Sequence, residues 1–163
     1  MHPVVRTLQQ HAALLAIVAF VVGLVLVVTA IPGRAVSILH VQLSILALVC
    51  GPGIVGTLAF AAVADDPSPS WLLLVGVVGV FASMVSLFVG FLAVVGGQEP
   101  YLSPEMPAFQ LYEAVDNAVQ FGLPTLVFAG GATVCGRVEG IARLAVLAAT
   151  TVALVPATVV AAS

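Results

Sequence analysis

Long apolar runs constrain this chain more than any other feature, because almost every stretch of more than about fifteen residues is hydrophobic. The chain has 163 residues, of which 62% are apolar and 7% are charged. Soluble domains are about 45–50% apolar, and four basic and seven acidic side chains are too few to cover the exterior of such a domain. We therefore expect a lipid bilayer, rather than water, to surround most of this protein.

Five apolar segments are separated by short polar connections. Each provides roughly the 20 residues that a helix needs to cross about 30 Å of hydrocarbon. The apolar runs are continuous, whereas a strand of a membrane barrel alternates apolar and polar residues over only about ten positions. Barrel strands are therefore disfavoured. We predict an all-α, polytopic transmembrane helical bundle forming a single domain over residues 1–163, with spans 8–31, 35–64, 71–96, 107–134 and 141–162. Four helices would remain if the first segment were a cleaved signal peptide, although its apolar core is longer than the usual 7–15 residues.

Helix starts and membrane interfaces are marked by particular residues. Ser68-Pro69 and Ser103-Pro104 each place a hydroxyl cap before a proline at the first helical position. Aromatic residues with a polar group are enriched at both interfaces of a bilayer. Trp71, Tyr101 and Tyr112 are near the predicted segment ends.

The arginines predict an orientation in the cell membrane. In a five-helix threading, Arg6, Arg137 and Arg143 fall on one side of the membrane and Arg34 on the other. Because basic residues favour the cytoplasmic side, we expect a multi-pass protein with a cytoplasmic N-terminus. Glu139 and Arg143 are four residues apart, and we expect them to form an ion pair at that surface.

The fourth segment breaks the apolar pattern in its first half. Glu113, Asp116, Asn117 and Gln120 recur at i, i+3, i+4 and i+7, so they share one face of a helix. In one interpretation this stripe lies in water at the outer headgroups. In the other it lies below the interface, faces the bundle interior and forms a polar or proton site.

His40 is the candidate partner for that stripe. Ser37, His40 and Ser44 share a face of the second segment, whose start lies on the same membrane side as the start of the fourth. We therefore consider a pairing of His40 with Asp116 or Glu113, which would suit a proton-coupled carrier or a quinone pocket. The alternative is a histidine that bonds to a neighbouring residue or to headgroups near a helix end.

Gly51, Pro52 and Gly53 lie near the middle of the second segment. Proline removes one helical hydrogen bond and clashes with the preceding turn, so we expect a bend there. The bend is a candidate hinge, or a fixed kink that lets a long helix fit the bilayer. Close helix packing is expected at the small-residue pairs Gly79/Ser83, Ser86/Gly90 and Gly136/Gly140.

Several functions are disfavoured by the sequence. Four scattered arginines do not predict nucleic-acid binding. We expect no cofactor and no metal site: the Cys and His spacing does not suit zinc, and His11 and His40 begin their segments at opposite faces of the membrane, which disfavours bis-histidine haem. Ser37 or Ser44 with His40 and Asp116 could be drawn as a hydrolase triad, but no GxSxG motif supports it, and we name no catalytic residue.

Two functions remain from the sequence. The first is an integral membrane protein without its own catalysis, acting as a subunit, scaffold or partner-binding bundle. Its partners would be lipid and either other membrane subunits or further copies of the chain. The alternative is a transporter or proton-linked component that uses the polar face of the fourth segment.

Overall fold

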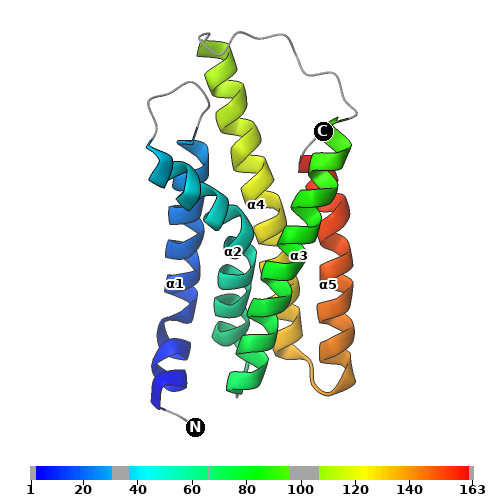
Figure 1. The fold of residues 1–163 in the computed structure, drawn as a ribbon. Helices are drawn as coiled ribbons and strands as arrows, with labels where there is room; N and C mark the ends of the chain where they lie inside the picture. The colour runs from blue at the N-terminus through cyan, green and yellow to red at the C-terminus, as the bar shows by residue number, and fades with distance from the viewer. Residues whose placement is uncertain (1–2, 31–36, 66, 96–106, 162–163) are drawn as a thin grey trace.

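The computed structural model describes residues 3–30, 37–65, 67–95 and 107–161. It contains five helices: α1 (Pro3–Val28), α2 (Ile38–Val63), α3 (Pro69–Val95), α4 (Pro107–Arg137) and α5 (Ile141–Ala161), as Figure 1 shows. All five are long and apolar enough to cross a membrane, so the predicted all-α fold is confirmed. The main difference in bounds is at α1, which begins at Pro3 rather than near residue 8.

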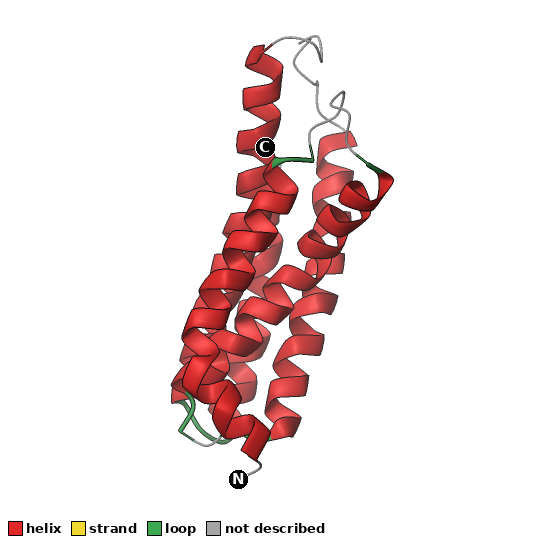
Figure 2. Ribbon diagram, turned by 90° about the vertical axis from the view of Figure 1, so that its left-hand side faces the viewer, coloured by secondary structure: helices red, strands yellow, loops and turns green. Residues whose placement is uncertain are grey.

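The helices run alternately up and down along one axis (Figures 1 and 2). The start of α1, the α2–α3 link and the α4–α5 turn therefore share one end, which we call the N-terminal end, and the opposite end is the far end. Helix α2 packs against α1, α3 and α4, while α5 packs against α3 and α4. Arg137 and Arg143 lie at the N-terminal end, on the side where the sequence placed them.

The bundle has a core of buried side chains, and many large apolar side chains are exposed on its outer surface. Side chains such as Phe60, Val75, Phe128 and Leu154 are buried in a shared core. The most exposed positions include large hydrophobic side chains that a water-soluble protein would bury: Leu14, Ile17, Leu39, Leu73, Phe81 and Leu111. Such a surface is favourable when hydrocarbon, rather than water, is the neighbour.

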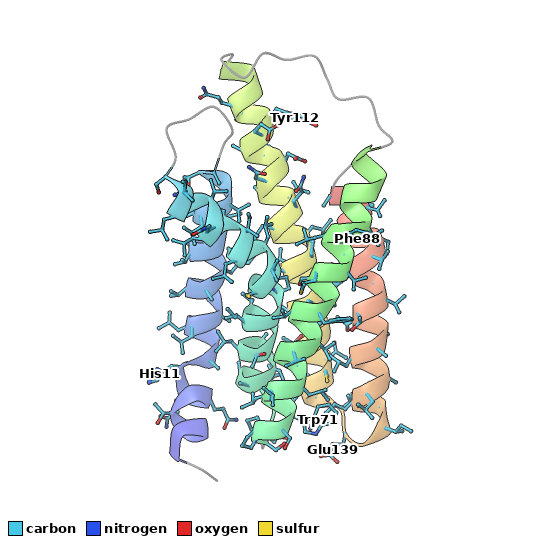
Figure 3. All side chains as sticks on the ribbon, viewed as in Figure 1. His11, Trp71, Phe88, Tyr112 and Glu139 are labelled. Atoms are coloured by element: carbon cyan, nitrogen blue, oxygen red, sulfur yellow. The ribbon has the colours of Figure 1, made fainter. Side chains whose placement is uncertain are left out.

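The predicted cap at Ser68 is present, and the structure adds a second cap at Ser37. The Trp71 backbone N–H lies 3.4 Å from Ser68 Oγ, and Pro69 opens α3. Ser37 caps α2, because its hydroxyl oxygen accepts from the His40 N–H at 3.2 Å. Trp71 lies near the N-terminal end and Tyr112 toward the far end (Figure 3). Ser103, Pro104 and Tyr101 lie outside the described residues.

Candidate functional site: the polar face of α4

Four polar residues in the first half of α4 share one side of the helix and are half-buried. Glu113, Asp116, Asn117 and Gln120 all have intermediate exposure. The Gln120 amide donates to Asp116 Oδ2 at 2.7 Å, which links the two successive turns of the stripe. We call these four residues the polar face of α4.

The larger apolar residues of the same turns are exposed, whereas Ala114 and Ala118 are intermediate. Leu111 is 68% exposed, Tyr112 47%, Val115 55% and Val119 39%. An amphipathic helix on a water-soluble protein has the reverse arrangement, with its apolar stripe toward the core. A lipid surrounding accounts for the exposed apolar residues of α4, because they can then face hydrocarbon.

Ser86 of α3 is an unusual buried hydroxyl near the same depth. Other buried hydroxyls donate to the carbonyl four residues earlier in their own helix: Ser83 to Gly79 at 2.7 Å, Thr125 to Phe121 at 2.6 Å and Thr158 to Leu154 at 2.9 Å. Ser86 is only 2% exposed, and among the described residues its Oγ has no hydrogen-bond partner. A buried polar atom without a partner is costly, so Ser86 is a candidate to bind a further polar group.

The depth of Ser86 follows from a contact between α3 and α4. Gly79 of α3 lies against the ring of Phe128 of α4. The two helices run in opposite directions (Figure 1), and seven residues separate Gly79 from Ser86, as they separate Phe128 from Phe121. Both steps rise about 10 Å, so Ser86 lies near the level of Phe121, beside the last residue of the polar face.

His40 binds α1. Its Nε2 lies 3.0 Å from Thr29 Oγ1 and 3.1 Å from the Leu26 carbonyl oxygen. Ser44, one turn along α2, donates to the same Leu26 carbonyl at 2.8 Å. The described partners of the His40 ring therefore lie at the end of α1. This is the arrangement of the alternative interpretation, in which the histidine bonds to a neighbouring residue. A pairing of His40 with Asp116 is not among the described hydrogen bonds.

Gly51, Pro52 and Gly53 lie inside a continuous α2, which changes direction partway along (Figure 1). Here the glycines make room for neighbouring helices. A Cβ atom on Gly51 would fall 2.5 Å from the ring of Phe121 of α4, and one on Gly53 would fall 2.7 Å from the Gly76 carbonyl oxygen of α3. The same Phe121 ring also lies against Gly23 of α1. These contacts give the two glycines a packing role, and a hinge at the bend stays a prediction.

The small-residue pairs behave differently from one another. Gly79 packs against Gly53, and Gly136 packs against Val63 and the Phe60 carbonyl of α2. Gly140, by contrast, has a φ of 60° in the turn between α4 and α5, with nothing within 4 Å of its would-be Cβ. Gly140 therefore makes a tight turn, a conformation that favours glycine, and does not form a packing pair with Gly136.

Arg143 has a structural role that the sequence pattern did not reveal. Its Nε donates to the carbonyls of Cys135 at 3.2 Å and Val138 at 3.0 Å, at the end of α4. Its guanidinium carbon lies 5.0 Å from the ring centre of Trp71 and 5.4 Å from that of Phe60. The expected ion pair with Glu139 is not among the contacts of the described residues.

Within the described ranges, no group of three or more His, Cys, Asp and Glu side chains is placed to hold a metal ion. Comparisons with protein-family models, with curated proteins and with solved structures found no match to this chain. The fold and the site define a class: a bundle of helices of membrane-spanning length, one of which carries a stripe of half-buried polar residues.

Proposed function

We propose that the protein is a multi-pass membrane protein in which the polar face of α4 binds or relays a proton or a small polar solute. The observation that carries this proposal is the arrangement of the first half of α4, where the polar stripe is half-buried and the larger apolar residues are exposed. A carboxylate below the interface is costly, so such groups usually mark a path for ions or substrate. Asp116 is the residue to which we assign the proton or the solute contact.

Two neighbouring groups support this assignment. Gln120 holds the Asp116 carboxylate through a 2.7 Å hydrogen bond, which fixes its position. Ser86 provides a buried hydroxyl near the same depth, with its hydrogen-bonding capacity unused by the described residues. A water molecule or solute between α3 and α4 would give the Ser86 hydroxyl the partner that it lacks among the described residues.

The orientation belongs to the proposal as well. Arg137 ends α4 and Arg143 is in the first turn of α5, so both lie at the end that holds the start of α1, and basic residues favour the cytoplasmic side. We therefore propose a cytoplasmic N-terminus, so that the polar face of α4 lies toward the outer side. A cysteine introduced at Asp65, in the exposed link after α2, should then react with an impermeant reagent only from the inside.

The test is proton flux in liposomes that contain the purified protein and a trapped pH-sensitive dye. The wild type should dissipate an imposed pH gradient, and Asp116→Asn should reduce the rate at least tenfold with an unchanged helical spectrum. Asp65→Asn is the matched control, because it makes the same chemical change at an exposed position outside the helices. Asp116→Asn with wild-type flux would refute the role of this residue.

A second function is favoured by the close packing of two α4 phenylalanine rings against glycines of the neighbouring helices. Phe121 lies against glycines of α1 and α2, and Phe128 against glycines of α2 and α3, which favours a bundle of fixed shape. A bundle of this kind suits a non-catalytic subunit or scaffold, with the polar face of α4 binding a polar residue of a partner helix. If liposomes that contain the wild-type protein show no flux of protons or small solutes, this function is favoured over the first.

A further inference from the structure

An apolar groove of about 350 Å³ lies between α1 and α2. From α1 its lining includes Val22 and Leu26, and from α2 it includes Leu43, Ala47, Cys50 and Ile54. Gly23 and Gly51 also line it, and the Phe121 ring of α4 lies against both of them. Val22, Leu46 and Ile54 of the lining are each about half exposed, so the groove opens on the outer surface of the bundle.

Two polar side chains lie beyond the far end of the groove. His40 precedes Leu43 by three residues on α2, and Thr29 follows Leu26 by three on α1, so both continue the two lining faces. His40 Nε2 and Thr29 Oγ1 lie 3.0 Å apart and join the two helices there. A long apolar surface therefore ends at a hydrogen-bonding pair.

The hydrogen bonds assign the tautomer of His40. The Thr29 hydroxyl donates to the Val25 carbonyl at 2.6 Å, so its oxygen acts as an acceptor toward His40. The Leu26 carbonyl, 3.1 Å from Nε2, can only accept. In the neutral ring, Nε2 must therefore carry the hydrogen, and Nδ1 is an acceptor for which the described residues provide no partner.

We propose that this groove binds one membrane lipid, with a hydrocarbon chain along the apolar lining and a headgroup hydroxyl that donates to His40 Nδ1. The volume lies near the lower end of the range for small-molecule sites, about 300–1,000 Å³. A partner helix, about 10 Å across, is too wide for a groove between two helices that contact each other. The site rests on the proposed membrane location but not on the transport of protons or solutes.

Native mass spectrometry of the detergent-purified protein tests the position of the chain. With added phosphatidylglycerol, the wild type should retain one lipid. Ala47→Phe, which fills the groove, should weaken this binding at least tenfold. Leu46→Trp narrows the groove from its exposed rim, where residue 46 is 56% exposed, and should weaken it as well. Ala148→Phe, on the exposed side of α5, is the matched control and should bind as the wild type does.

The headgroup contact is tested with phosphatidylmethanol of the same chains, which keeps the negative charge and lacks the hydroxyl. One hydrogen bond corresponds to a preference of about fivefold for phosphatidylglycerol, and His40→Phe should abolish that preference. Wild-type binding by both groove variants, or equal binding of the two lipids to the wild type, would overturn the proposal. Neither result would depend on proton flux, which reports on the polar face of α4 alone.

Discussion

Gly53 of α2 and Gly79 of α3 meet backbone to backbone, because a Cβ atom on Gly79 would fall 2.5 Å from Gly53 Cα. Neither backbone can yield without moving a whole helix. Helices in a membrane approach this closely only where small residues line the contact. This contact lies beside Pro52, so the bend of α2 and its crossing with α3 are formed by the same few residues.

Gly53→Ala should therefore destabilise the bundle by about 1–3 kcal/mol, the usual cost of inserting atoms into a packed contact. Gly130→Ala is the control, since nothing lies within 4 Å of a Cβ at that helical position. It should be neutral or stabilising by up to about 1 kcal/mol, because alanine favours helix. Thermal unfolding in detergent, followed by circular dichroism, measures both. Equal stability of the two variants would argue against the close crossing.

Phe121 and Gly51 should be energetically coupled. Gly51→Ala places a methyl group against the Phe121 ring, so it should destabilise the wild type. Phe121→Ala removes the ring at a cost of about 3–5 kcal/mol. In that background Gly51→Ala should cost much less, since the clash is gone. A double-mutant cycle measures the difference, and additive effects would show that the ring does not lie on Gly51.

Arg143→Lys should destabilise the N-terminal end by about 1–2 kcal/mol, although it keeps the charge. Lysine lacks the planar group that lies over Trp71 and the Nε donor that binds the carbonyls of Cys135 and Val138. The chain has one tryptophan, so its fluorescence reports on this contact directly. Arg137→Lys, at an exposed position, should leave the emission unchanged. An unaltered spectrum in Arg143→Lys would contradict the stacked geometry.

The sequence predicted the helices well because hydrophobic length and proline breakers are local signals. The shared face of Asp116 and Gln120 also followed from spacing alone, since a helix of any orientation places residues four apart together. Their hydrogen bond at 2.7 Å agrees with that reading.

Contacts between helices were harder to predict. The starts of α2 and α4 lie at one end, but so does the end of α1, and the rotation of α2 about its axis turned His40 toward Leu26 and Thr29. Sequence spacing carries no information on that rotation. For Glu139 and Arg143, the spacing rule did not apply, because α4 ends at Arg137 and α5 begins at Ile141, which leaves Glu139 in the turn between them.

The most direct test of the account is a spin-label scan of residues 111–120 in lipid nanodiscs, in a background with Cys50→Ala and Cys135→Ser. Labels at 111, 115 and 119 should show the highest accessibility to oxygen, which concentrates in hydrocarbon. Labels at 113, 116, 117 and 120 should show the lowest. The reverse periodicity would contradict the account. So would high accessibility of labels 113, 116 and 117 to a water-soluble relaxation agent when none of the labels lies in hydrocarbon, because the polar face of α4 would then be in water.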